Sequence, residues 1–281
     1  MESIIIDGIT IHLTTPDPSP NHWIGREKSR LKLKAALMCL EGETPLSPSL
    51  IGEPGLGKTT LACNMSYEFD LPVYIQQCTM DIRPEDLLII PVLSEKKEIT
   101  YRASSLLTAM IKGGICVLDE ANRMSEKAWA SLVPLLDYRR YVESIVAGIK
   151  ITAHQNFRLI CTMNEDPSTY IIPEYIQSRI SPKVPVGLPS DEEIHQILET
   201  HAGIEHDSAV IETIAKFIKK SFEKQEAMFS SKKVAMDINL RSGIRALKYL
   251  SHLKNISQVN LSDEAFVRSI IRNEFYEVQQ R

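Results

Sequence analysis

Short apolar runs alternate with helix-like stretches between residues 50 and 180. The runs lie at residues 50–51, 73–77, 115–118 and 157–162. Alternation of strand-like and helical patterns predicts βαβ units and a mainly parallel sheet flanked by helices. We therefore expect an α/β nucleotide-binding type of fold in this part of the chain.

The first residues follow a different pattern. Two β-branched runs, at residues 4–6 and 9–11, precede Pro16, Pro18 and Pro20. Proline does not fit a helix interior, so we expect a strand pair and a linker here, as an N-terminal extension over residues 1–21.

Apolar residues at helical spacing predict the first helix between Arg26 and Glu41, and Gly42 is placed to end it. They are Leu31, Leu33, Ala36, Leu37 and Leu40. Further on, residues 141–153 alternate like a short hairpin with Gly148 in its turn, which predicts an insertion before the strand at 157.

The pattern changes after Pro189. Ser190 and Glu193 form a capping-box sequence, and Ile194, Ile197 and Leu198 follow at helical spacing. Further helical patterns lie near 191–201, 207–224, 240–254 and 261–279. We therefore expect an α/β core over residues 22–188 and a small all-helical lid over 189–281.

Composition narrows the class of protein. The 281 residues are 43% hydrophobic and 24% charged, which is typical of a globular protein. With a net charge of −4, the chain lacks the excess of basic residues that is typical of sequence-independent nucleic-acid binders. Five widely spaced cysteines without a C-x-x-C pair, no long apolar run and no basic N-terminal signal predict a reduced, cytoplasmic protein without a membrane span.

One motif indicates phosphate binding. The segment Gly52-Glu53-Pro54-Gly55-Leu56-Gly57-Lys58-Thr59-Thr60 satisfies G-x-x-x-x-G-K-[ST], follows a predicted strand and leads into a helical run. Its glycines permit a tight turn in which backbone N–H groups face an anion. We expect Lys58 to reach the β and γ phosphates and Thr59 to supply a hydroxyl to Mg²⁺.

Polar residues end two of the predicted strands. Asp119 and Glu120 follow the run at 115–118, and Asn164 ends the strand-like segment that begins at residue 157. Ligands of open α/β sheets bind at the carboxyl ends of the strands, so these side chains should meet there. We expect Asp119 to hold Mg²⁺ and Glu120 to orient or deprotonate the attacking water.

Residues 22–254 resemble the AAA+ ATPases, and among them the MoxR-like and dynein-like branch with an insertion in its second helix. Beyond the two phosphate-site motifs, the resemblance rests on four segments in order: Trp23-Ile-Gly-Arg26-Glu27, Gln77-Cys-Thr-Met-Asp81-Ile-Arg-Pro-Glu-Asp86-Leu87, Asp119-Glu-Ala-Asn122-Arg123, and His154-Gln-Asn-Phe157-Arg158-Leu-Ile-Cys-Thr162-Met-Asn164.

The resemblance implies further roles. Trp23, Ile24 and Gly25 would line an adenine pocket, and Asn164 would be the first sensor, which holds the attacking water. Arg179 aligns with the arginine finger that reaches the neighbouring subunit's site. Arg241 fits the second sensor, with Arg245 as the competing assignment.

The chain also departs from the family pattern. The insertion near residues 88–101 lacks the glycine usual after the Asp-Leu pair, and residues 101–106 have Ala and Ser where relatives commonly have Pro-Gly. Lys96 and Lys97 are flanked by Glu95 and Glu98, which favours a solvated hairpin tip over a nucleic-acid contact.

We therefore expect a Mg²⁺-dependent ATPase that forms a ring, with six subunits as the family likeness implies. Its activity would be coupled to remodelling, maturation or chaperoning of a protein partner, which is a client or an adaptor. Two alternatives stay open. One is an ATP-loaded switch that hydrolyses slowly while it recruits a partner, and the other is a nucleic-acid motor, against which the charge balance weighs.

Overall fold

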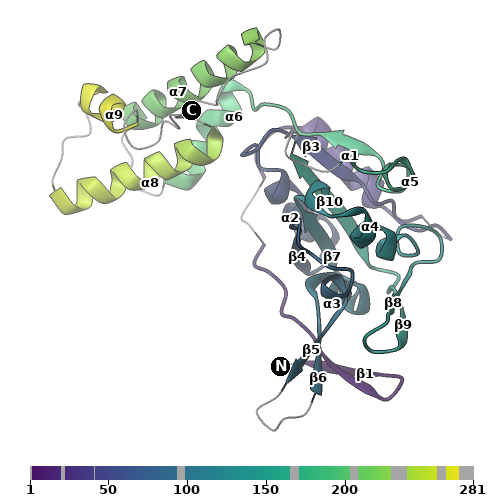
Figure 1. Cartoon of the computed structure of the whole chain (residues 1–281). Coiled ribbons are helices and arrows are strands. Elements are labelled where there is room, and N and C mark those ends of the chain that lie inside the picture. The colour runs from purple at the N-terminus through teal and green to yellow at the C-terminus, as the bar shows by residue number, and fades with distance from the viewer. Residues whose placement is uncertain are drawn as a thin grey trace. The chain divides into compact units, whose positions relative to one another are not determined.

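The structure is a computed structural model that describes residues 2–19, 23–40, 42–93, 99–164, 171–202, 208–228, 239–257 and 264–271 (Figure 1). Contacts divide the chain into two units. The α/β unit comprises Met1–Trp23 and Glu27–Val186, and the helical unit comprises Ile24–Arg26 and Gly187–Arg281.

A parallel sheet forms the centre of the α/β unit. Its five strands lie in the order β11-β3-β10-β7-β4, and every neighbouring pair is parallel. They are β3 (Ser49–Gly52), β4 (Val73–Gln77), β7 (Ile115–Asp119), β10 (Arg158–Asn164) and β11 (Lys183–Pro185). The predicted α/β fold with a mainly parallel sheet is confirmed.

Helices flank this sheet (Figure 1). They are α1 (Glu27–Leu37), α2 (Lys58–Phe69), α3 (Ser105–Lys112), α4 (Glu126–Leu132) and α5 (Glu174–Gln177), with 3-10 turns η1 (Glu85–Leu87) and η2 (Ala121–Arg123). Ser104 and Ser125 cap α3 and α4 by accepting from the backbone N–H groups of Leu107 and Ala128. Strands β7 and β10 are buried along almost their whole length, as expected of central parallel strands.

The predicted N-terminal strand pair is confirmed, and it belongs to a larger sheet. Strands β1 (Ser3–Ile6) and β2 (Ile9–His12) join β6 (Ile99–Ala103) and β5 (Ile89–Leu93) in the order β1-β2-β6-β5. Strand β2 runs parallel to β6, and Ile11 lies opposite Tyr101. The N-terminal extension thus completes the sheet of the second-helix insertion, whose tip at residues 94–98 lies outside the described residues.

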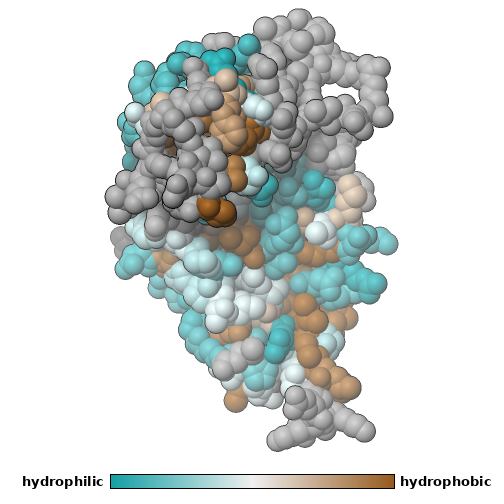
Figure 2. Space-filling model, turned by 90° about the vertical axis from the view of Figure 1, so that its left-hand side faces the viewer, coloured by the Kyte–Doolittle hydropathy of each residue, from teal (hydrophilic) through white to brown (hydrophobic). Residues whose placement is uncertain are grey.

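This four-stranded sheet is buried in part and exposed in part. Ile11 and Ile89 are fully buried in the core of the α/β unit. Ile5, Leu93 and Ile99 are 70%, 68% and 66% exposed. Figure 2 shows apolar surface at this end of the unit.

The first helix is shorter than the sequence predicts. Helix α1 ends at Leu37, and Leu31 and Leu40, which we expected on its apolar stripe, are 52% and 63% exposed. The Ala36 carbonyl oxygen accepts from the Leu46 backbone N–H at 3.0 Å. That contact with the following loop takes the acceptor that the next helical turn would need.

The predicted hairpin is confirmed. Strands β8 (Tyr141–Ser144) and β9 (Ile149–Thr152) pair in antiparallel register, with Gly148 at a φ of 64° in the connection.

The helical unit consists of α6 (Asp191–Ala202), α7 (Ser208–Met228), α8 (Leu240–Ser257) and α9 (Glu264–Ile270) in its described part. The capping box is confirmed, because Ser190 N donates to Glu193 Oε2 at 2.9 Å and Glu193 N donates to Ser190 Oγ at 3.2 Å. Of the predicted helix at 261–279, residues 261–263 and 272–279 lie outside the described residues. None of the described helices is long and apolar enough to cross a membrane.

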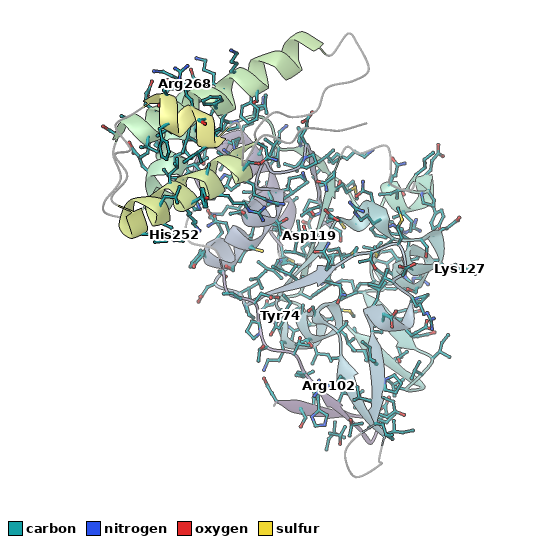
Figure 3. The ribbon with its side chains drawn as sticks, turned by 60° about the vertical axis from the view of Figure 1, so that its left-hand side comes forward. Tyr74, Arg102, Asp119, Lys127, His252 and Arg268 are labelled. Atoms are coloured by element: carbon teal, nitrogen blue, oxygen red, sulfur yellow. The ribbon has the colours of Figure 1, made fainter. Side chains whose placement is uncertain are left out.

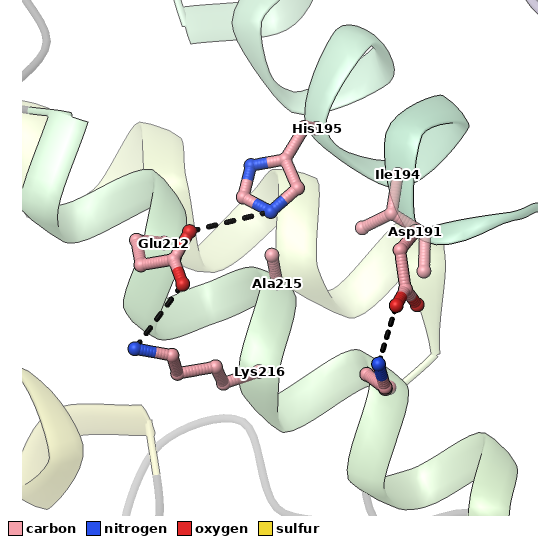
Figure 4. A pocket seen from close by; sticks show the side chains of 7 residues that line it. Asp191, Ile194, His195, Glu212, Ala215 and Lys216 are labelled. Atoms are coloured by element: carbon pink, nitrogen blue, oxygen red, sulfur yellow. Dashed lines mark hydrogen bonds and ion pairs between the residues drawn. The ribbon is translucent and has the colours of Figure 1, made fainter.

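Ion pairs link α6 to α7 around a small hollow (Figure 4). Glu212 of α7 lies 3.3 Å from His195 of α6 and pairs with Lys216 of its own helix at 3.1 Å, and Lys219 of α7 pairs with Asp191 of α6. Exposed pairs of this kind contribute only about 0–1 kcal/mol each, so packing between the apolar faces of the helices stabilises the unit. Helix α8 also packs closely on α7 at Gly243, since a Cβ added there would lie 2.5 Å from Ile218 Cδ1.

The cysteines give a direct check on the core. Cys39 is exposed, whereas Cys63, Cys78, Cys116 and Cys161 are free and buried. Burial raises the pKa of all four, to about 12 for Cys63 and Cys161. At pH 8 they should therefore carry little thiolate, the form that reacts.

We predict that a thiol-disulfide reagent such as DTNB modifies one thiol per folded chain at pH 8, and the other four only after unfolding. Cys39→Ser should remove the fast reaction. Rapid modification of two or more thiols in the folded Cys39→Ser protein would contradict the described core.

Candidate functional site

The phosphate-binding motif forms the turn between β3 and α2. Gly55 and Gly57 have φ values of 84° and 87°, in the left-handed region that glycine adopts without strain. Gly52 has a different reason to be glycine, because an added Cβ would lie 2.5 Å from the Val186 carbonyl oxygen. Of the other residues of the motif, Leu56 is buried and Pro54 is exposed, while Glu53 and Thr60 lie between these extremes.

Lys58 begins α2 and is only 6% exposed. Its Nζ donates to the carbonyl oxygens of Gly52 at 2.8 Å and Glu53 at 2.7 Å. A buried ammonium needs such partners, since leaving a charge without hydrogen bonds in the interior is costly. The cation is therefore held inside the turn, beside the backbone of the glycine-rich loop.

The carboxylate of Asp119, which is labelled in Figure 3, joins three elements of the site. Its Oδ1 accepts from Thr59 Oγ1 of α2 at 2.6 Å and from Thr162 Oγ1 of β10 at 2.6 Å. Asp119 itself ends β7. The structure thus brings together the phosphate-binding turn and the carboxyl ends of the two central strands.

Sequence reasoning did not single out Thr162 as a site residue. Its position in the strand does indicate a site residue. Residues two apart in a strand share a face, and Thr162 precedes Asn164 by two. Thr162 is 2% exposed. Its hydroxyl also accepts from the Glu120 backbone N–H at 3.1 Å.

Glu120 lies between two polar partners. Its backbone has a φ of 56°, uncommon for a residue other than glycine. Its Oε1 accepts from Asn164 Nδ2 at 3.1 Å, and its Oε2 lies 2.6 Å from Arg123 Nε. Asn164 therefore meets Glu120 as the sequence predicts, and Arg123 is an additional partner that sequence reasoning gave no role.

Asn122 holds the Asn164 segment from the other side. It is 7% exposed, and its Nδ2 donates to the Asn164 carbonyl oxygen at 2.8 Å. The 3-10 turn η2 thus contacts both the side chain of Glu120 and the backbone of Asn164. Such side-chain to backbone bonds fix the direction of catalytic groups.

The residues expected at an adenine pocket lie where the chain changes unit. Trp23 belongs to the α/β unit, and Ile24 and Gly25 belong to the helical unit. Gly25 has a φ of 73°, and an added Cβ would overlap the carboxyl group of Glu193. The positive φ is what favours glycine here, because the Glu193 carboxyl group is the end of a flexible side chain.

Arg26 is also held by Glu193. Its backbone N–H donates to Glu193 Oε1 at 2.6 Å. Burial lowers the pKa of the Arg26 guanidinium, and the nearby Glu193 carboxylate opposes that effect. The turn at residues 24–26 is therefore fastened to the first turn of α6.

The predicted arginines lie in different units. Arg179 follows α5, is partly exposed, and donates through Nη1 to the Tyr175 carbonyl oxygen. No hydrogen bond or ion pair joins Arg179 to the phosphate-binding turn or to Glu120 within the described ranges. Arg241, in the first turn of α8, and Arg245, one turn later, are both exposed in the helical unit.

The available oxygens fit Mg²⁺ in a phosphate site. In the described part of the chain, no group of three or more His, Cys, Asp or Glu side chains could hold a metal ion. Mg²⁺ in nucleotide sites takes one or two protein ligands and completes its shell with phosphate oxygens and waters. The Thr59 hydroxyl and the Asp119 carboxylate form such a small donor set.

Comparison with known proteins agrees with this geometry. Residues 49–180 match the family model of the AAA domain (dynein-related subfamily). This part of the chain therefore resembles the AAA domain of the dynein-related subfamily. The match includes the phosphate-binding turn, Asp119, Glu120, Asn164 and Arg179.

Two staphylococcal proteins are similar in sequence. The uncharacterized protein SH1500 of Staphylococcus haemolyticus is 26% identical over 256 residues, which cover 89% of this chain and 91% of that protein. The uncharacterized protein SERP0979 of Staphylococcus epidermidis is 32% identical over 120 residues, 41% of this chain and 46% of that protein.

Solved structures share the fold. A mutant of the RuvB protein of Thermotoga maritima superposes with a TM-score of 0.65 at 18% identity, over 95% of this chain and 77% of that one. NtrX of Brucella abortus, solved in complex with ATP, gives a TM-score of 0.51 at 18% identity, over 83% of this chain and 51% of that one. At this level of identity the likeness shows the fold alone.

We predict that Thr162→Val destabilises the protein by about 1–3 kcal/mol, because it removes the donor to Asp119 and the acceptor of the Glu120 N–H at a buried position. ATP turnover should fall with it. Chemical denaturation and a phosphate-release assay measure the two effects. Thr162→Ser keeps the hydroxyl and should retain most of the turnover, so equal losses in both variants would contradict the role given to the hydroxyl.

Proposed function

We propose that this protein hydrolyses ATP in a Mg²⁺-dependent reaction at the carboxyl edge of its parallel sheet, as a subunit of a ring that acts on a protein partner. One observation carries the proposal. Asp119 Oδ1 accepts from both Thr59 and Thr162, so the phosphate-binding turn lies beside Glu120 and Asn164.

The turn would bind the phosphates. Backbone N–H groups of Gly55 to Thr60 and the start of α2 favour negative charge, and Lys58 would turn from the loop carbonyls to the β and γ phosphates. Thr59 and Asp119 would hold Mg²⁺. When bound, Mg²⁺ supplies positive charge that neutralises the phosphate oxygens.

Glu120 would act as the base. A carboxylate can orient a water molecule and accept its proton as the water attacks the γ phosphate. Asn164 Nδ2 lies 3.1 Å from Glu120 Oε1, close enough to hold the same water. This geometry supports Glu120 and Asn164 as a pair that acts on one nucleophile.

Arg179 would act on a neighbouring subunit. It makes no hydrogen bond to its own phosphate-binding turn among the described residues, where its Nη1 donates to the Tyr175 carbonyl oxygen. This arrangement supports a role for Arg179 away from the phosphate-binding turn of its own subunit. An arginine supplied in this way raises turnover by about 10³ to 10⁵ in other nucleotide hydrolases, which would make hydrolysis depend on ring assembly.

The helical unit would respond to the nucleotide as a lid. Trp23, Ile24 and Gly25 would contact adenine. The contact of Gly25 and Arg26 with Glu193 supports this, because it fastens the chain just after Trp23 to α6. Arg241, or Arg245 in its place, would sense the γ phosphate from α8.

One observation favours a second candidate function. Both carboxylate oxygens of Glu120 already have partners, Asn164 and Arg123. A carboxylate held in this way could not accept a proton until a neighbour or partner releases it. The protein would then hydrolyse ATP slowly in the absence of that partner. An ATP-loaded switch that recruits a protein is therefore the alternative to a continuously working remodeller.

A third candidate, a nucleic-acid motor, has less support. RuvB of Thermotoga maritima, which shares the fold, is a Holliday junction branch migration motor. The net charge of −4 in the present chain does not favour a nucleic-acid partner. A reduced, cytoplasmic protein with a protein client remains the proposal.

We predict that Lys58→Ala abolishes ATP binding, because the buried cation beside the loop is lost. Glu120→Gln should bind ATP with about wild-type affinity and lose at least ~100-fold in turnover, since the amide cannot accept a proton. Equilibrium binding of a fluorescent ATP analogue and phosphate release measure the two steps. Near-normal turnover by Glu120→Gln would remove Glu120 from its role.

A further inference from the structure

A hollow of about 210 Å³ opens between three segments of the α/β unit. Pro84, Glu85 and Leu88 line it from the region of η1, and Ser131 lines it from α4. Residues 143–146, at the end of β8 and in the hairpin turn, close the third side. None of these residues belongs to the ATPase site.

The base of the hollow is held by hydrogen bonds. Leu88 is 3% exposed, and its carbonyl oxygen accepts from Ser104 N at 2.9 Å. Ser104 Oγ also donates to the Leu87 carbonyl oxygen at 2.6 Å. On the hairpin side, Ser144 Oγ accepts from Ala147 N at 3.3 Å. The hollow is therefore formed before any partner arrives.

Its rim combines negative charge with apolar surface. Glu85 and Glu143 are exposed, and neither carboxylate has a hydrogen bond or ion pair with the described residues. Ile145 and Val146 are 96% and 41% exposed beside them.

The nearest basic residue across the hairpin is engaged elsewhere. Lys150 lies opposite Glu143 in the β8–β9 register. Its Nζ lies over the Tyr141 ring, 3.6 Å from the centroid, in a cation–π contact. Glu85 and Glu143 thus line a preformed hollow, and no described residue of their own unit pairs with either carboxylate.

We propose that this hollow binds an arginine or lysine side chain, flanked by apolar residues, from a peptide segment of a partner protein. The charged group would meet Glu85 and Glu143, and its aliphatic stem would pack on Leu88 and Ile145. A metal ion fits less well, because the described residues offer no group of three or more metal-binding side chains. Nucleic acid is disfavoured by the like charge of the rim.

The test titrates the full chain, without nucleotide, with the peptide acetyl-Leu-Arg-Leu-amide and follows binding by NMR or calorimetry. We expect saturable binding with a Kd of about 1 mM or tighter. The same peptide with citrulline, the neutral isostere of arginine, should bind about tenfold more weakly. Glu85→Gln and Glu143→Gln should each weaken binding of the arginine peptide by about three- to tenfold.

Glu199→Gln, on α6, is the matched control, since it makes the same change of charge at an exposed position in the helical unit and should leave binding unchanged. Absence of saturable binding, equal affinity for arginine and citrulline peptides, or full affinity in both hollow variants would each overturn the proposal. ATP turnover of Glu85→Gln should stay within about twofold of wild type. If the wild-type protein does not hydrolyse ATP, the proposed function is contradicted, whereas the result of the peptide-binding experiment still stands.

Discussion

The site depends on one carboxylate oxygen. Asp119 Oδ1 accepts hydrogen bonds from the hydroxyls of Thr59 and Thr162, both at 2.6 Å. Through these bonds the end of β7 fixes the first turn of α2 on one side and β10 on the other. Hydrogen bonds to a charged acceptor are stronger than neutral ones, and their loss leaves the carboxylate short of partners. This explains why hydroxyl side chains stand at both positions.

The remaining geometry follows from that junction. Thr162 also accepts from the Glu120 backbone, so β10 sets the direction in which the Glu120 side chain leaves β7. Asn164 and Arg123 then hold the two carboxylate oxygens, and Asn122 holds the Asn164 backbone. The phosphate-binding turn and the base are thus connected by a continuous series of short polar contacts inside one unit.

Local features of the sequence were sufficient to predict much of the fold and of the site. Buried parallel strands read as apolar runs, and the glycine-rich turn has a spacing that its backbone geometry demands, so the sheet and the phosphate-binding motif could be predicted. Parallel strands share their carboxyl edge, which placed Asn164 beside Glu120. These inferences need only periodicity within a segment.

Long-range contacts could not be predicted from the sequence in the same way. The pairing of β2 with β6, the early end of α1 at the Leu46 contact, and the approach of Gly25 to Glu193 each depend on a contact outside the segment itself. Thr162, Asn122 and Arg123 matter through partners that periodicity does not identify. The hollow beside Glu85 and Glu143 likewise arises only when η1, α4 and the hairpin come together.

The most direct test of a shared ATPase site is the turnover rate per subunit as a function of protein concentration, with Mg²⁺, for wild type, Arg179→Ala and Glu120→Gln. The account predicts that the wild-type rate per subunit rises with concentration, that Arg179→Ala binds ATP without hydrolysing it, and that mixing Arg179→Ala with Glu120→Gln restores turnover. A wild-type rate independent of concentration, with no recovery in the mixture, would contradict a site completed by the neighbouring subunit.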